Sequence, residues 1–471
     1  MTAATCAKFD GKVVMVGCGA IGQALLAVID KHIENIAGRL YVLTNDADAR
    51  EIAEQHGAHF FVKRLTPENF RDTLAPYLGS GDLLINVSIN VASMDLIAFC
   101  AERDALYVDS SVEPWEGLFG NTATTLYQRS NFVMRQELLQ MIAAQPHHAP
   151  TAVVDHGANP GIVTHFVKQA LLNLDRDIRR GEARPTTPAE WAQLACDLGI
   201  TTIQISERDS QVSKIRRQTN EFVNTWSISG IIDELKQPSE VALGTFDPIA
   251  MPDMKEHMPG CSSYYLERIS ATAYARSWIP SCGPFLGMLV THDEVMAIAD
   301  FLSIKKGDTF TYRPTVMFVY QPCDDALLST YELEGRGWQR QTNFRLLDND
   351  IEGGRDELGV LLAGHQRNAY WFGSRLSIGE ARELVPTANA TIMQVVAGIT
   401  SGLVWALRHR RRGIVEPEAL DHELCLAVAA NYLGPLVGEY TEWTPLQGRG
   451  AQFPEQTNTA HPWDFQNIRS R

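Results

Sequence analysis

The chain lacks the features of a disulfide-stapled, zinc-binding or nucleic-acid-binding protein. None of its eight cysteines forms a C-x-x-C pair or a zinc knuckle, so we expect reduced thiols and no metal site. Lys and Arg number 41 against 56 Asp and Glu, a formal net charge of −15, which argues against a nucleic-acid partner. This acidic balance favours a cationic ligand.

A secretion signal and a clear membrane span are also missing. Residues 1–10 carry no basic region followed by an apolar core, so we expect a cytoplasmic protein. One uncharged stretch, residues 384–407, is followed by an arginine-rich segment at 408–412. Polar residues such as Asn389 and Gln394 interrupt the stretch, and its apolar residues recur at helical spacing. We therefore predict a buried or interface helix, and no membrane partner.

The first 110 residues alternate short apolar runs with helical patterns, which is typical of an α/β fold with a parallel sheet. A polar stretch at 145–150 precedes a new apolar strand at 151–154, which places a domain boundary near residue 150. The 471 residues then divide into 1–150 and 151–471, with C-terminal segments free to pack back on the first domain. The pattern predicts strands at 12–16, 39–44, 82–87 and 105–109, and helices at 21–32, 46–56 and 93–103.

A glycine motif follows the first predicted strand and opens the first helix. In this context G-x-G-x-x-G lets the backbone approach a dinucleotide pyrophosphate. A glycine turn needed only for packing is the lesser alternative. After the second strand comes an acidic segment suited to the adenosine ribose, and no Arg adjoins it to hold a 2′-phosphate, which favours NAD over NADP. The predicted cofactor-binding residues are Gly17, Gly19, Ala20, Ile21, Gly22, Thr44, Asn45 and Asp46.

Two further segments carry polar groups at the ends of predicted elements. Asn159 and Pro160 precede a helical run at 162–174, where Asn159 fits either a helix N-cap or a ligand contact. Glu207 ends a strand whose alternate residues are apolar, so it is either an inward carboxylate or an exposed strand end.

Four more candidates are weak by themselves. Trp226 closes a predicted strand at 223–226, and Glu234 follows in a short helix; the ordinary alternatives are a core tryptophan and a solvated glutamate. Thr291 begins a T-x-x-E capping box that would place His292 exposed at the first helical position, where it is either incidental or a proton carrier. Asp356 stands just before an apolar strand.

With Gly17–Gly22, Asn159–Gly161, Asn224–Ser227, Cys323–Ala326 and Asp356–Leu362 all in order, the chain resembles the bacterial homospermidine synthases, relatives of the saccharopine dehydrogenases. The resemblance covers nearly the whole chain. It implies an N-terminal Rossmann domain with a doubly wound parallel sheet, a second α+β domain for substrate binding and dimerisation, a homodimer and a tightly held NAD.

The resemblance also implies site residues. Trp226 would be the tryptophan of a polyamine pocket, and Glu113 would lie near the nicotinamide. Glu116 or Asp293 could instead take the roles of Glu113 or His292. The remaining pocket residues would be Asn159, Glu207, Glu234, His292 and Asp356.

The family chemistry joins two putrescines into homospermidine with release of ammonia, through amine oxidation, amine exchange and reduction. Hydride leaves only from a neutral amine, and deprotonating an alkylammonium at pH 7 costs about 4 to 5 kcal/mol, so a general base is needed. We expect His292 or a pocket carboxylate in this role, Glu234 at the distal ammonium, and Trp226 in a cation–π contact. Alternatives are a saccharopine or carboxynorspermidine dehydrogenase, whose substrate needs an arginine, and an NAD-binding sensor without turnover.

Overall fold

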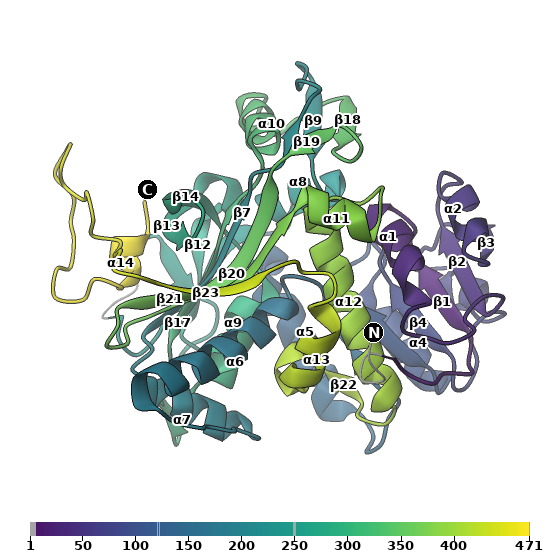
Figure 1. Ribbon diagram of the computed structural model, residues 1–471, viewed down its shortest axis with the longest axis horizontal. Helices are drawn as coiled ribbons and strands as arrows, with labels where there is room; N and C mark the ends of the chain where they lie inside the picture. The colour runs from purple at the N-terminus through teal and green to yellow at the C-terminus, as the bar shows by residue number, and fades with distance from the viewer. Residues whose placement is uncertain (1–5, 120, 122, 248–250, 471) are drawn as a thin grey trace.

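The computed structural model describes residues 6–119, 121, 123–247 and 251–470. Figure 1 shows two sheets side by side with helix α12 between them. The fold is mixed α/β, with a Rossmann-like sheet at the N-terminus and a second, mixed sheet after it. The two sheets create the junction at which the candidate site lies.

The first sheet has seven parallel strands. Its central strands β1, β4 and β5 are fully buried and rich in Val, Leu and Ile, as expected for a covered parallel sheet. In spatial order the strands are β22 (Ile414–Val415), β6 (Ala152–Val153), β5 (Leu106–Asp109), β4 (Leu83–Asn86), β1 (Val13–Val16), β2 (Leu40–Thr44) and β3 (His59–Val62). The early helices are α1 (Ala20–Ile29), α2 (Arg50–Gln55), α3 (Phe70–Leu74), α4 (Ser93–Glu102) and α5 (Asn131–Ala144).

The predicted boundary near residue 150 falls inside this sheet, because β6 and β22 both follow it in sequence. β6 pairs with β5, and β22 pairs with β6. The C-terminal region thus supplies both a strand and helix α12 (Ala390–Arg408), which contacts α1 and β5. The sequence allowed C-terminal segments to pack on the first domain, and β22 and α12 do so.

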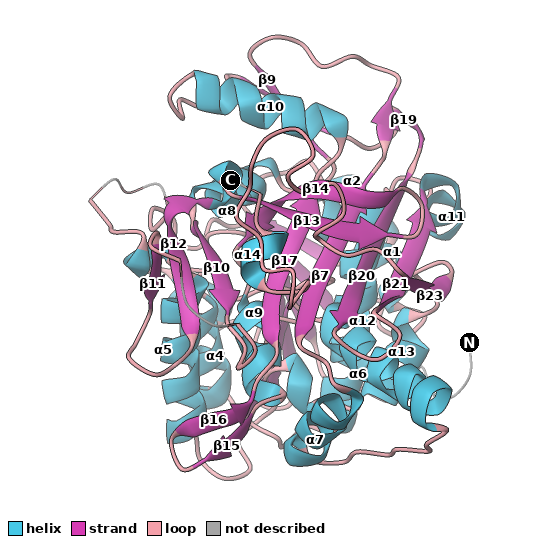
Figure 2. Cartoon of the chain, turned by 90° about the vertical axis from the view of Figure 1, so that its left-hand side faces the viewer, coloured by secondary structure: helices cyan, strands magenta, loops and turns pink. Residues whose placement is uncertain are grey.

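The second sheet has ten strands. Its main path runs β11 (Met254–Glu256), β12 (Ser263–Ile269), β10 (Pro238–Ala242), β17 (Thr315–Gln321), β7 (Thr202–Asp209), β20 (Arg355–Ala363), β21 (Ala369–Ser377) and β23 (Leu436–Thr441). The hairpin of β13 (Tyr274–Ile279) and β14 (Gly283–Val290) joins it through β17. Figure 2 shows the long central strands of this sheet, with α6 (Ile162–Leu174) and α7 (Pro188–Leu198) below them.

Small strand pairs and helices surround this sheet. The pairs are β15 (Ile304–Lys306) with β16 (Thr309–Tyr312), β9 (Glu221–Asn224) with β18 (Asn343–Leu346), and β8 (Val212–Ser213) with β19 (Ile351–Gly353). The helices are α8 (Ile228–Lys236), α9 (Asp293–Phe301), α10 (Asp324–Gly335), α11 (Ile378–Leu384), α13 (His422–Ala429) and α14 (Phe465–Ile468). In Figure 1, α10, β9, β18 and β19 project together from the top of the molecule.

Helix α12 is the described helix that is long and apolar enough to cross a membrane, and 94% of its most apolar window is buried inside the protein. Its burial agrees with the predicted interior helix. The helix begins with Asn389 as N-cap, whose side chain accepts a hydrogen bond from the Ile392 amide.

Candidate functional site

The glycine motif lies at the carboxyl edge of β1 and opens a cleft of about 930 Å³. Gly17 has φ +90°, and a Cβ there would meet the backbone of Val87 and Ser88 at 2.8 Å, so glycine is required. At Gly19 a Cβ would point into open space, which leaves the backbone accessible to a pyrophosphate. Gly22 lies behind the cleft, where it permits close packing on Gly17. The other predicted cofactor residues line the cleft: Ala20, Ile21, Thr44, Asn45 and Asp46.

Two basic residues at the end of β3 line the same cleft. Lys63 and Arg64 were absent from the prediction because β3 itself was not predicted. Arg64 is occupied by an ion pair, with its Nη2 2.8 Å from Oε2 of Glu116. An exposed pair of this kind is weak, generally about 0 to 1 kcal/mol. The groups in this cleft fit NAD, with a glycine turn for the pyrophosphate and Asp46 near the position expected for a ribose contact.

A second cavity of about 190 Å³ adjoins this cleft, and the two share Ile21, Val87–Asn90 and Ser227 in their walls. Six of the seven predicted pocket residues line it: Glu113, Asn159, Glu207, Trp226, Glu234 and His292. The described residues around it include no lysine or arginine. Apart from His292, the described lining therefore offers carboxyl groups to a ligand without a basic side chain to neutralise them.

Glu207 and Asn159 form one wall of the cavity. The side chain of Glu207 points inward from β7, as strand alternation predicts, and its Oε2 accepts a hydrogen bond of 2.7 Å from Nδ2 of Asn159. Asn159 is not a helix cap, because α6 begins at Ile162 with Gly161 as its N-cap. Burial raises the pKa of Glu207 to about 8, despite the opposing hydrogen bond from Asn159.

Trp226 follows the end of β9, which stops at Asn224, two residues earlier than predicted. Its indole Nε1 donates a hydrogen bond of 3.3 Å to the hydroxyl of Tyr320. Gly230 lies so close that a Cβ there would be 2.8 Å from Cζ3 of Trp226. The next residue, Ser227, is the N-cap of α8, and its Oγ accepts a hydrogen bond from the Gly230 amide.

His292 lies at the junction of β14 and α9. The predicted capping box is wrong: His292 itself is the N-cap residue, and the Thr291 hydroxyl donates instead to buried Glu240. The imidazole is held between two carboxylates, with Nε2 3.2 Å from Glu234 and Nδ1 3.1 Å from Glu294. Burial opposes a charge on His292, but these carboxylates raise its pKa well above its usual value. The side chain of His292 is mostly buried, whereas the sequence predicted an exposed residue.

Glu113 follows β5 and accepts a hydrogen bond of 3.3 Å from the amide of Asn90. Because Asn90 lines both the cleft and the cavity, Glu113 lies near their junction. Burial raises the pKa of Glu113 to about 8, and the nearby carboxylates of Asp233, Asp109 and Glu234 add to this effect.

Asp356 does not line the cavity. It lies within β20, fully buried, and accepts a hydrogen bond of 2.6 Å from the hydroxyl of Thr391, which does line the cavity. Its position in the strand register opposite Asp209 places it behind the wall. Burial, and then the charges of Glu207 and Asp209, raise its pKa well above its usual value.

Other lining residues carried no usable sequence signal. Tyr320 comes from the apolar strand β17, and Asp233 precedes Glu234 in an ordinary helical pattern. Asp293 is the first residue of α9 and follows His292. All three reach the cavity because sheet pairing, α8 and α9 bring them there, which local sequence does not encode.

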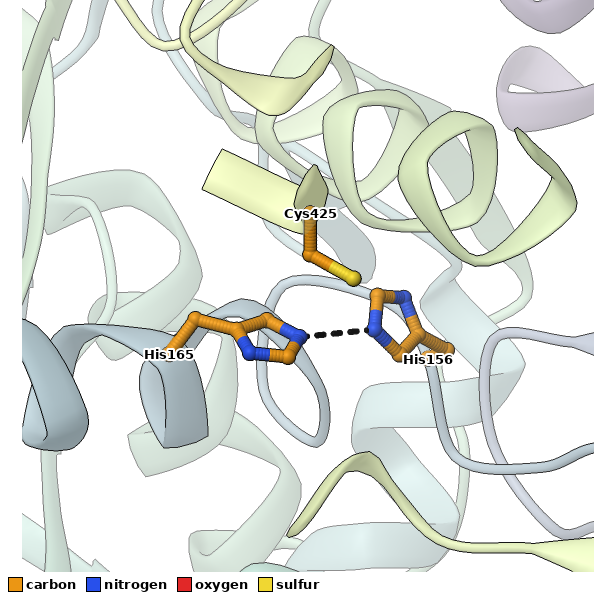
Figure 3. A group of neighbouring side chains, drawn as sticks. All are labelled: His156, His165 and Cys425. Atoms are coloured by element: carbon orange, nitrogen blue, oxygen red, sulfur yellow. Dashed lines mark hydrogen bonds between the residues drawn. The ribbon is translucent and has the colours of Figure 1, made fainter. Parts of the chain in front are cut away.

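A buried cluster behind the Asn159 loop contains His156, His165 and Cys425, whose ligand-type atoms lie within 4.8 Å of one another (Figure 3). His156 Nε2 lies 2.9 Å from His165 Nε2, and its Nδ1 lies 2.8 Å from the carbonyl oxygen of Gly398. Burial lowers the pKa of His156 to about 4, so the ring is neutral at pH 7. The cluster comes from three separate segments, so the spacing of cysteines and histidines could not reveal it.

The site joins a dinucleotide cleft to an acidic cavity, which defines a two-domain nicotinamide-dependent protein of the saccharopine dehydrogenase type. Sequence profiles described as the saccharopine dehydrogenase NADP binding domain and the saccharopine dehydrogenase C-terminal domain match residues 13–153 and 157–441.

Full-length relatives narrow this class. The chain is 43% identical to the homospermidine synthase of Blastochloris viridis over 98% of both chains. It is 40% identical to that of Mesorhizobium japonicum over 98% of this chain and 96% of the relative. The crystal structure of homospermidine synthase from Legionella pneumophila in complex with NAD is 41% identical, with a TM-score of 0.92 over 99% of both chains. The chain belongs to the homospermidine synthase family.

Proposed function

We propose that this protein condenses two putrescines to homospermidine with release of ammonia. The observation that carries the proposal is the cavity lining, which includes Glu113, Glu207 and Glu234 but no lysine or arginine among its described residues. A diamine with two positive charges is complementary to such a lining. The amino-acid substrate of a saccharopine-type dehydrogenase carries a carboxylate, which this lining would repel.

The reaction conserves atoms and electrons. One putrescine loses a hydride and a proton and becomes an imine; the amine of the second putrescine adds at the imine carbon, and the first nitrogen leaves as ammonia. The resulting secondary imine regains the hydride and a proton, so two putrescines give one homospermidine and one ammonia. NAD, when bound in the adjoining cleft, would be the reversible hydride acceptor. The overall reaction therefore has no net redox change.

The protein must take a proton from the reacting ammonium. His292 is a poor base because two carboxylates keep it protonated. Glu113 lies at the junction of cleft and cavity. Burial raises its pKa to about 8, but a substrate ammonium beside it favours the ionised form, which can accept the proton. We assign Glu113 the role of general base, with Glu207 and Asn159 orienting the amine.

The other end of the substrate stays charged. Glu234 pairs with the distal ammonium while His292, held on its other side, fixes the orientation of this carboxylate. The face of Trp226 stabilises the cationic intermediates by a cation–π contact of about 2 kcal/mol when desolvated. Asp356 acts on the cavity from behind its wall, through its hydrogen bond from Thr391.

A single assay tests the proposal. Purified protein is incubated with putrescine and NAD, and the products are followed by amine chromatography, ammonia release and absorbance at the NADH band. Homospermidine and ammonia in equal amounts, without NADH, are expected. Accumulating NADH would indicate a dehydrogenase, and no turnover would indicate an NAD-binding sensor; either result overturns the proposal.

We also propose that the protein is a cytoplasmic homodimer. The eight cysteines are free thiols, which suits a reducing compartment. Light scattering of the purified protein tests the dimer.

A further inference from the structure

One large aromatic side chain lies exposed in the wall of the dinucleotide cleft. Phe344 on β18 is 52% exposed and lines the same cleft as the glycine motif. In Figure 1 the β9–β18 pair projects beside α8, on the side of the substrate domain that faces α1. An exposed phenyl ring is costly in water, about 25 cal/mol for each Å² of apolar surface, unless a partner covers it.

The local structure of β18 fixes the face of the strand from which the Phe344 side chain projects. Side chains alternate along a strand, so Phe344 and Leu346 share one face of β18 and Arg345 takes the other. Arg345 is fixed by an ion pair of 2.8 Å from its Nε to Glu221 and by a second pair with Asp350. Leu346 also lines the cleft. The strand thus presents a two-residue apolar face to the cofactor site, with Arg345 anchoring it from behind.

We propose that Phe344 covers the NAD bound in this cleft and is the residue that slows its dissociation. The inference rests on the proposed function, because a reaction that regenerates NAD at every turnover has no need to exchange it. The occupant is defined by the cleft itself, whose lining also includes Gly17 and Gly19 of the glycine motif.

Cofactor exchange without any amine tests this directly. Purified holoprotein is mixed with excess isotopically labelled NAD, and bound label is measured after rapid desalting at successive times. We expect Phe344→Ala to exchange about tenfold faster than wild type, as for the loss of one aromatic contact to a base or ring, and Phe344→Leu to fall between them. The variant should also purify with less bound NAD.

Phe453→Ala is the matched control, because Phe453 is equally exposed, 56%, but does not line the cleft. It should exchange at the wild-type rate. Equal exchange in Phe344→Ala, Leu346→Ala and wild type would overturn the proposal. If Phe344→Ala fails to fold, Phe344→Leu and Leu346→Ala decide it by the same rates. Absence of NAD from wild-type protein would instead contradict the cofactor assignment, and failure to convert putrescine would leave the exchange result unaffected.

Discussion

The carboxyl of Glu234 differs from the others in the cavity because it already has a cationic partner. Its Oε1 lies 3.2 Å from His292 Nε2, and the same imidazole contacts Glu294. Two carboxylates therefore share one histidine, which leaves negative charge available for a substrate ammonium. The contact between Glu234 and His292 could not be predicted from the sequence, since the two residues lie on separate elements.

Replacing Glu234 with Gln should lower the specificity constant for putrescine by at least 100-fold. The amide keeps the volume but cannot balance the distal ammonium, and a buried charge left unpaired costs about 3 to 5 kcal/mol. Butylamine lacks that second ammonium, so any residual turnover of it should change little. The measurement is kcat/KM for both amines, with thermal melting to verify the fold. Unchanged putrescine turnover would move the distal contact to Glu207.

Trp226 is expected to tolerate Phe better than Ala. A phenyl ring retains a weaker π face, whereas alanine retains none, so Trp226→Phe should keep part of the activity and Trp226→Ala should lose nearly all of it. Initial rates of homospermidine formation measure the difference. Tyr320→Phe is a useful companion, because it removes only the hydroxyl that accepts from the indole. Equal activity of the Phe and Ala variants at position 226 would exclude the cation–π role.

At the scale of elements, helix α12 explains why an apolar, membrane-like sequence is needed inside the protein. Gly398 and Gly402 lie one turn apart and face the loop that carries Asn159; at Gly402 a Cβ would stand 2.9 Å from the His156 ring. The Gly398 carbonyl oxygen also accepts a hydrogen bond of 2.8 Å from Nδ1 of His156. The helix therefore supports the loop that carries Asn159 through close backbone packing.

Gly402→Ala should destabilise the protein by about 1 to 3 kcal/mol, because the added methyl group overpacks this contact. It should also lower putrescine turnover by displacing the loop. Gly335→Ala is the control: a Cβ at this glycine of α10 meets nothing within 4 Å. Denaturant unfolding and kcat/KM of both variants provide the comparison. If Gly402→Ala had the stability of the wild type, the close contact between Gly402 and His156 would not contribute to stability.

Elements with strong local patterns were predictable. α6 has the predicted bounds, 162–174, and β1, β2, β4 and β5 lie within a residue of prediction. β3 and β22 were missed because each is short and defined by pairing with distant strands. The capping box at Thr291 failed for a tertiary reason, since buried Glu240 captures the Thr291 hydroxyl. The family resemblance supplied Glu113 and the roles of the other pocket residues, which local patterns alone left ambiguous.

At the scale of the whole molecule, many buried carboxyl groups keep their protons near neutral pH. Burial raises the pKa of both Glu113 and Glu207 from 4.5 to about 8, so the folded protein holds protons that the unfolded chain has released. His156 has the opposite effect on the pH dependence of stability, because burial lowers its pKa from 6.5 to about 4. This effect is confined to the pH range between about 4 and 6.5. Above pH 6.5 the carboxyl effect is therefore unopposed by this histidine.

The free energy of unfolding of the substrate-free protein should consequently fall as the pH rises from 6.5 to 8. Each of the two glutamates contributes a loss of about 2 kcal/mol over this interval, since one pKa unit corresponds to about 1.4 kcal/mol. Denaturant unfolding at fixed ionic strength across this range measures the slope. Glu207→Gln removes one titrating group and should make the slope shallower, whereas Glu383→Gln, at an exposed position of α11, should leave it unchanged. A flat profile in wild type, or equal slopes in wild type and Glu207→Gln, would mean that these carboxyls are already ionised in the folded cavity.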